Sequence, residues 1–157
     1  MNQPSDGANV RFPPPLIYVA GLAIGIGVDR ILRLPTLGLP LMTRSIAGAL
    51  IAVLGFLVMF AGAGLFLRKR TAIIPFKPAS SLVTSGVLGL TRNPMYLGMA
   101  IFYAGLAVVL DSLAALLVLP LVLAVVQTQV IAREEAYLER AFGREYVEYK
   151  SRVRRWI

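Results

Sequence analysis

The sequence predicts an all-α integral membrane protein, a helical bundle of about four transmembrane helices followed by an amphipathic C-terminal helix. Of the 157 residues 57% are apolar, and the mean hydropathy of +0.74 is far above that of a soluble domain of this size. Long uncharged runs recur along the chain, and the charged residues stand between and after these runs rather than inside them. We therefore treat residues 1–157 as a single membrane domain.

Composition excludes several classes of function. The chain has neither cysteine nor histidine, which removes disulfides, thiolate nucleophiles, the commonest general base and the commonest metal ligands. We expect no metal. The net charge of +8 comes without a nucleic-acid motif, so anionic lipid headgroups and orientation in the bilayer explain the basic residues better than nucleic acid does.

The N-terminal part predicts a short head and two spans within residues 12–67. Residues 1–11 are polar, which favours a disordered head. A first helix is expected from near Pro15 to near Leu34, with Gly21, Gly25 and Gly27 allowing close helix packing and with an interfacial pair at residues 29 and 30. The uncharged run 45–67 is the clearest span, because its 23 residues suffice to cross a hydrocarbon core of about 30 Å.

Charge predicts the orientation of these spans. Between residues 68 and 94 the chain holds five basic residues and no acidic one, so this loop should face the cytosol. Two further uncharged runs, 93–110 and 112–132, are separated only by Asp111 and predict a helical hairpin. Both termini are then cytosolic.

The tail after Ala132 predicts one cytosolic amphipathic helix. Its apolar positions recur at helical spacing and form a single stripe, which consists of Leu138, Phe142, Tyr146, Tyr149 and Val153. The last residues, Arg152, Arg154, Arg155 and Trp156, are expected at the lipid headgroups.

The stretch 82–98, LVTSGVLGLTRNPMYLG, is too rich in Gly, Pro and hydroxyl residues for a membrane helix, although membrane helices flank it. Gly86 and Gly89 allow positive φ or a close approach of the backbone to a ligand, and Arg92 adds a charge beside a turn. Pro94 suits the first turn of a helix, whose open N–H groups attract a carboxylate. This stretch therefore predicts a polar binding site at the membrane surface.

Two motifs, this stretch and EEAYLERAFGREYVEYKSRVRRWI at 134–157, together resemble the membrane-embedded methyltransferase family that includes the isoprenylcysteine carboxyl methyltransferases and, more distantly, phospholipid N-methyltransferases. The resemblance covers about residues 75–157. It implies S-adenosylmethionine as the cofactor and a small lipophilic acceptor, with residues 68–157 forming a cofactor loop, the hairpin and the C-terminal helix. The implied cofactor-binding positions are Ser80, Ser81, Leu82, Val83, Gly86, Leu88, Arg92, Asn93, Pro94, Met95 and Tyr96.

The same resemblance implies that Glu134 places the acceptor. An ammonium acceptor must lose a proton before it is methylated, and either Glu134 or Glu135 is a candidate to receive it, whereas a carboxylate acceptor needs no base. Val130 stands where the prenylcysteine enzymes have an arginine thought to hold the substrate, and Arg133 is the candidate replacement. The chain also has Leu88 where those enzymes have tyrosine and Asn93 where they have histidine.

Other interpretations stay open at this point. The paired glutamates also suit ordinary surface charge at a helix start. A phospholipid N-methyltransferase, a small transporter subunit and a non-catalytic membrane scaffold are the alternatives to a methyltransferase of the prenylcysteine type. The transporter is disfavoured, because no ionisable residue falls in the middle of a predicted span.

Overall fold

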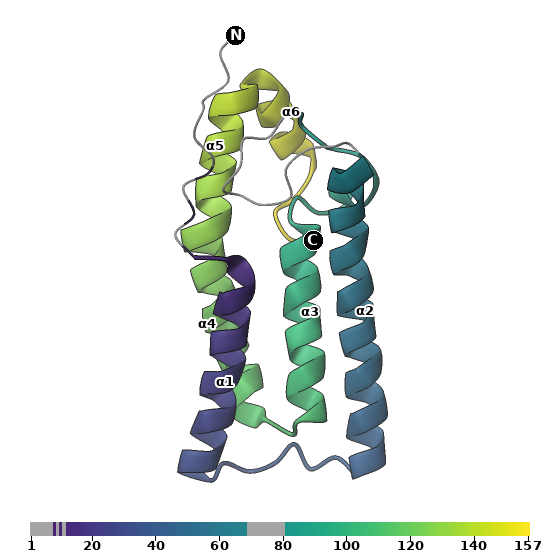
Figure 1. Cartoon of the computed structure of the whole chain (residues 1–157), viewed down its shortest axis with the longest axis vertical. Helices are drawn as coiled ribbons and strands as arrows, with labels where there is room; N and C mark the ends of the chain where they lie inside the picture. Colours follow the sequence, from purple (N-terminus) through teal and green to yellow (C-terminus); the bar gives the residue numbers. More distant parts are fainter. Residues whose placement is uncertain (1–7, 9, 11, 69–80) are drawn as a thin grey trace.

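A computed structural model describes residues 8, 10, 12–68 and 81–157, and in these residues every regular element is a helix (Figure 1). The all-helical prediction is confirmed. In chain order the elements are α1 (Pro14–Leu32), α2 (Leu41–Arg68), the 3₁₀ turn η1 (Gly86–Gly89), α3 (Pro94–Val109), α4 (Leu113–Val126), the π-helical turn η2 (Gln127–Ile131), α5 (Ala132–Phe142) and α6 (Arg144–Arg152).

Three helices of the described residues are long and apolar enough to cross a membrane: α1, α2 and the continuous helix Leu113–Phe142 formed by α4, η2 and α5. Helix α3 is equally apolar but has only 16 residues, which gives about 24 Å at 1.5 Å per residue. It falls short of a full hydrocarbon core. The structure thus supports three of the four predicted spans by length, and the fourth stays a prediction.

The prediction of one helix for the tail after Ala132 is wrong. The helix that begins at Leu113 continues through the π turn to Phe142, and the break comes at Gly143, whose φ of +53° ends α5. Helix α6 then turns back over the end of the bundle (Figure 1). The single stripe predicted for the tail is consequently divided between two helices, and its buried members are Tyr146 and Tyr149 of α6.

Glycines bring helices together in two pairs. Helix α2 packs mainly on α3, where a Cβ added at Gly55 would lie 2.3 Å from the Phe102 nitrogen and one at Gly98 would lie 2.5 Å from the Met59 nitrogen. Helix α1 packs on α4 in the same way through Gly21 and Gly25. The packing role predicted for these last two is confirmed, whereas Gly27 has no atom in reach of an added Cβ, and that part of the prediction is wrong.

These contacts predict the effect of a single added methyl group. Gly55→Ala should lower the free energy of unfolding by about 1–3 kcal/mol, because the backbone of α3 must move to admit a Cβ. Gly64→Ala in the same helix meets open space and should be neutral or slightly stabilising. Denaturant titration of both variants in detergent tests the assignment, and equal stability of the two would contradict the close approach of α2 and α3.

The end of the bundle away from α6 is fastened by two aspartates. Asp29 accepts hydrogen bonds from the Ser112 hydroxyl and, at 3.0 Å, from the Ala114 nitrogen, and so holds the start of α4. Asp111 forms an ion pair with Arg44 and accepts a bond from the Leu37 nitrogen at 2.9 Å. Asp29 thus caps α4 by accepting from its first turn, and the interfacial placing of residues 29 and 30 stays a prediction.

Two residues of the N-terminal head are part of the core. Ala8 and Val10 are buried, and both belong to the apolar cluster that contains Tyr18 and Tyr96. Burial of these two small side chains differs from the disordered head that the sequence predicts. The remaining head residues, 1–7, 9 and 11, lie outside the described part of the chain.

Candidate functional site

The loop before α3 is built around Gly86 and Leu88. Gly86 has φ +62° and lies against Leu65 of α2, so the predicted positive φ is confirmed there. Leu88 is buried, and its carbonyl accepts a hydrogen bond from the Tyr149 hydroxyl at 2.7 Å. Among the predicted cofactor positions nearby, Ser81 is exposed and Val83 is buried.

Two predicted cofactor positions complete this part of the loop. Leu82 is half-buried. Ser80 lies outside the described residues, so its role in cofactor binding stays a prediction.

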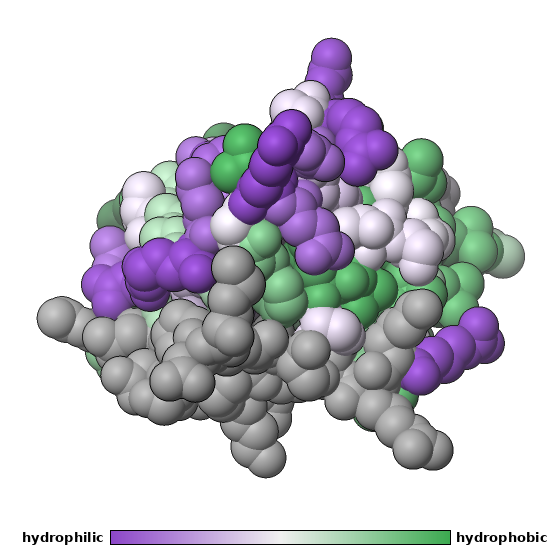
Figure 2. All heavy atoms as spheres, turned by 90° about the horizontal axis from the view of Figure 1, so that it is seen from above, coloured by the Kyte–Doolittle hydropathy of each residue, from purple (hydrophilic) through white to green (hydrophobic). Residues whose placement is uncertain are grey.

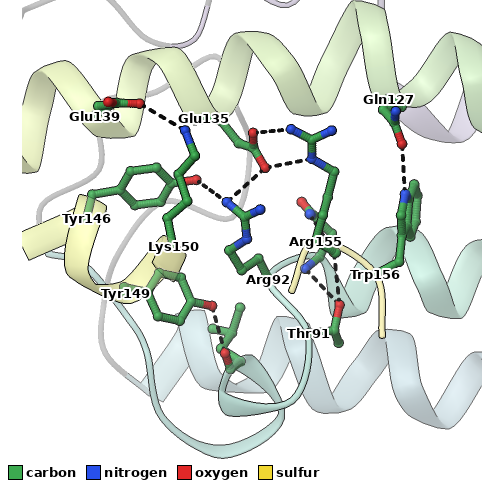
Figure 3. Close-up of polar contacts among 12 residues, drawn as sticks. Thr91, Arg92, Gln127, Glu135, Glu139, Tyr146, Tyr149, Lys150, Arg155 and Trp156 are labelled. Atoms are coloured by element: carbon green, nitrogen blue, oxygen red, sulfur yellow. Dashed lines mark hydrogen bonds and ion pairs between the residues drawn. The ribbon is translucent and has the colours of Figure 1, made fainter. Parts of the chain in front are cut away.

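The end of the chain runs against the last residues of this loop. The Arg92 nitrogen donates to the Arg154 carbonyl at 3.0 Å, and the Arg155 carbonyl accepts from Thr91 Oγ1 at 3.2 Å and from Asn93 Nδ2 at 3.0 Å. We call residues 154–156 the C-terminal strap; Figure 3 shows it crossing between the loop and α5. The side chain of Asn93 is thus engaged with the protein itself, although the sequence predicts it as a cofactor contact.

The strap also corrects the headgroup prediction for two of its residues. Trp156 Nε1 donates to Gln127 Oε1 at 3.0 Å, at the first residue of the π turn (Figure 3). The Arg155 guanidinium points inward as well, whereas Arg152 and Arg154 are exposed. No pattern in the sequence predicts that these two side chains point inward, because the tail is both basic and aromatic, as a membrane-surface segment would be.

A cluster of charges under the strap is centred on Glu135. Its carboxylate accepts from Arg155 Nε at 2.9 Å and from Arg155 Nη2 at 2.6 Å, and its Oε1 lies 3.1 Å from Arg92 Nη1 (Figure 3). The side chains of Glu135 and Arg92 are only 10% and 9% exposed. One carboxylate therefore joins the loop, α5 and the strap.

The electrostatics outside the membrane spans follow from this burial. Burial chiefly, with a contribution from the charge of Glu135, raises the pKa of Tyr146 to about 12. The bidentate bond to Glu135 raises the pKa of Arg155 above its ordinary value. Tyr146, whose hydroxyl is 3.5 Å from Arg92 Nη1, therefore stays protonated at any physiological pH.

Arg92 has one group with no protein partner. Its Nε atom is buried and has no hydrogen-bond partner among the described residues. A buried donor of this kind is costly unless something accepts from it. Helix α3 also begins without a side-chain cap at Asn93, so the N–H groups of its first turn are open to another acceptor.

Glu134 faces a different partner from its neighbour. Consecutive residues of an α-helix point about 100° apart, and Glu134 Oε1 accepts a hydrogen bond from the Tyr96 hydroxyl at 2.5 Å. Tyr96 is buried in the first turn of α3. The same turn contains Pro94 and Met95, which are also predicted cofactor positions. The structure thus brings Tyr96 and Glu134, which are 38 residues apart, into direct contact.

The two residues predicted to hold the acceptor lie on either side of the start of α5. Val130 is 1% exposed and sits in the π turn, so it presents neither a charge nor an open surface. Arg133 is partly exposed, and its Nη2 donates to Gln129 Oε1 at 3.3 Å. The π turn itself was not predicted; such turns are frequent at functional sites, but no short motif identifies one.

An apolar groove lies lower on the bundle between α1 and α4. The residues that line it include Phe12, Leu16, Ile24, Leu121 and Val125. At the loop end, Figure 2 shows hydrophilic side chains interspersed with hydrophobic ones on the described surface. The described residues contain no group of three Asp, Glu, His or Cys side chains placed to hold a metal ion.

Fold and site define a class: a small helical membrane protein with a polar site at one end of its bundle, assembled from the loop before α3, α5 and the strap. Comparison with known families places it further. The family model described as phospholipid methyltransferase matches residues 44–145, well over half of the chain, and the protein belongs to this family. Its members are S-adenosylmethionine-dependent methyltransferases.

Individual relatives are similar over shorter segments. The chain is 38% identical over 72 residues to protein-S-isoprenylcysteine O-methyltransferase of Schizosaccharomyces pombe, which covers 46% of this chain and 30% of that protein. It is 39% identical over 72 residues to protein-S-isoprenylcysteine O-methyltransferase B of Arabidopsis thaliana, with 46% and 36% covered. An uncharacterized protein of Haemophilus influenzae is 55% identical over 47 residues, 30% of this chain and 73% of its own length. The matched segment spans about a third of the yeast and plant enzymes.

Proposed function

We propose that this protein is a single-domain integral-membrane methyltransferase that moves the methyl group of S-adenosylmethionine to a small lipophilic acceptor. The observation that supports it most directly is the contact between Tyr96 and Glu134, within the segment that matches the family. It sets a carboxylate beside the first turn of α3, which contains three of the predicted cofactor positions. The apolar groove between α1 and α4 suits a lipophilic acceptor.

The residues present fit the proposed cofactor. The Nε of Arg92, which has no partner among the described residues, and the start of α3, which has no side-chain cap, are donors that suit the carboxylate of an amino acid moiety. Gly86, at positive φ, keeps the loop free of a side chain where it turns. We propose that Gly86, Arg92 and the turn from Pro94 to Tyr96 hold the cofactor, whose sulfonium supplies an activated methyl group.

The work left to the protein is alignment and exclusion of water, because methyl transfer from a sulfonium is an in-line displacement. The Tyr96 hydroxyl fixes Glu134 by a short hydrogen bond. Glu134 would then place the acceptor and, for an ammonium acceptor, take up the proton that must leave before transfer. Glu135 is committed to two arginines, so we assign the role to Glu134 alone.

The acceptor need not be a prenylcysteine. A carboxylate held for reaction calls for a charge-assisted bond, typically to arginine. The prenylcysteine enzymes have an arginine at the position of Val130, which is a buried apolar residue here. Arg133 is the remaining candidate for that contact. A lipophilic amine, as in the phospholipid N-methyltransferases, suits Glu134 equally well and is the second candidate.

Labelled methyl transfer tests the proposal. Purified protein in lipid nanodiscs is given methyl-labelled S-adenosylmethionine and, in separate arms, a farnesylcysteine analogue, phosphatidylethanolamine or a total lipid extract. We expect label in the lipid extract and little in the farnesylcysteine analogue. Alkali distinguishes the products, because it releases methanol from a carboxyl methyl ester and leaves an N-methyl group in place. Absence of both cofactor binding and transfer would leave a scaffold or a transporter subunit.

We propose further that the site and both termini face the cytosol, because the segment 68–94 and the tail are basic. The chain has no cysteine of its own, so single cysteines at Asp111 and Arg152 report their side directly. In intact cells a membrane-impermeant thiol reagent should label Asp111→Cys and spare Arg152→Cys. The reverse pattern would contradict this orientation.

A further inference from the structure

The two helix pairs of the bundle are joined by tyrosine hydroxyls. Glycine contacts fix α1 on α4 and α2 on α3, as described above. Between the pairs, Tyr18 of α1 donates to the main-chain carbonyl of Tyr96 on α3 at 2.9 Å, and Tyr103 of α3 donates to the Ala115 carbonyl of α4 at 2.9 Å. Tyr18 and Tyr103 are buried, with side chains in an edge-to-face arrangement at 6.5 Å between ring centroids.

The bond from Tyr18 falls on the residue that contacts Glu134. Tyr96 is held twice, by Tyr18 at its carbonyl and by Glu134 at its hydroxyl. The turn of α1 that follows Tyr18 packs closely on α4, since a Cβ added at Gly21 would lie 2.2 Å from Val122 of α4. The first turn of α3 is therefore tied to the α1 and α4 pair at one main-chain atom.

We infer that Tyr18 is a positioning residue for the proposed reaction: it holds Tyr96, and through Tyr96 it holds Glu134, at the distance the acceptor requires. This inference rests on the proposed function. Tyr18 lies outside residues 44–145, so the match to the family says nothing about it. The first helix thus contributes to the site although all the predicted site residues lie between positions 80 and 135.

Tyr103 provides a matched control. Tyr18→Phe and Tyr103→Phe each remove one buried hydroxyl that donates to a main-chain carbonyl at 2.9 Å, so the two should lose similar stability in detergent. Only Tyr18→Phe should lower kcat, by about tenfold to a hundredfold, because a small displacement of an aligned group costs that much. The loss in Tyr18→Phe should be larger in kcat than in KM for S-adenosylmethionine.

A second measurement separates positioning from general loosening of the fold. In a Tyr96→Phe background, which lacks the hydroxyl that reaches Glu134, Tyr18→Phe should lower kcat no further. Three results would overturn the inference while leaving the proposed function in place. In an active wild type, kcat could be unaffected by Tyr18→Phe, it could fall equally in Tyr18→Phe and Tyr103→Phe, or the losses of kcat in Tyr18→Phe and Tyr96→Phe could be fully additive. A wild type that transfers no methyl group to any acceptor would overturn both.

Discussion

Glu134→Gln should reduce methyl transfer by about a hundredfold or more while leaving S-adenosylmethionine binding intact. Glutamine has the same shape, and its amide oxygen can still accept from the Tyr96 hydroxyl, so the first turn of α3 keeps its place. What it loses is the negative charge and the capacity to take up a proton. Single-turnover transfer from labelled cofactor, measured beside equilibrium cofactor binding, separates an effect on methyl transfer from an effect on cofactor binding.

The kind of loss also reports on the acceptor. For an ammonium acceptor the loss should fall on kcat, because deprotonation precedes transfer; for a carboxylate acceptor no base is needed, and Glu134→Gln should mainly change KM for the acceptor. Glu139→Gln is the control, since Glu139 lies on the same helix but pairs with Lys150 at the exposed surface. A wild-type kcat together with a wild-type KM for the acceptor in Glu134→Gln would remove this residue from the mechanism.

Hydropathy and charge predict the helices of this protein because each span is a long uncharged run. The run 45–67 lies inside α2, and Asp111 marks the turn between α3 and α4. What these patterns miss is where one helix continues into the next. After Ala132 the chain becomes charged, which indicates an end to the span. The helix nevertheless continues to Phe142, through a π turn that contains the buried Val130 and Ile131.

Only those features of the site that depend on neighbouring residues in the sequence could be predicted. The sequence indicates positive φ at Gly86 and a helix start at Pro94, and both are found. It also pairs Glu134 with Glu135 as equivalent candidates, and their difference depends on tertiary contacts that no local pattern encodes. One carboxylate meets Tyr96 on α3, and the other meets arginines from the loop and the strap.

Tyr18 illustrates the same limit at longer range. Its partner is 78 residues away, and in sequence it is one aromatic in an apolar run, indistinguishable from a residue that faces lipid. Arg155 and Trp156 are the converse case. They carry the composition of a membrane-surface tail, and only the ion pair to Glu135 and the bond to Gln127 turn them inward.

Glu135→Ala should lower the free energy of unfolding by about 3–5 kcal/mol. The carboxylate is the common partner of Arg92 and Arg155, and removing it leaves the buried Arg92 guanidinium with a positive charge and no counter-ion in the part of the chain that the structure describes. Because the strap is tied to the loop through the same group, the Arg155 carbonyl should also release Thr91 and Asn93. Denaturant titration in detergent measures the loss.

The interpretation depends on the pairing rather than on the carboxylate alone, and a double variant tests it. Glu135→Ala combined with Arg155→Met removes a charge of each sign, so its cost should be clearly smaller than the sum of the two single losses. Glu139→Gln, which breaks the exposed pair with Lys150, should cost less than about 1 kcal/mol. If Glu135→Ala were as stable as Glu139→Gln but inactive, Glu135 would belong to the chemistry after all, and the assignment of the two glutamates would have to be exchanged.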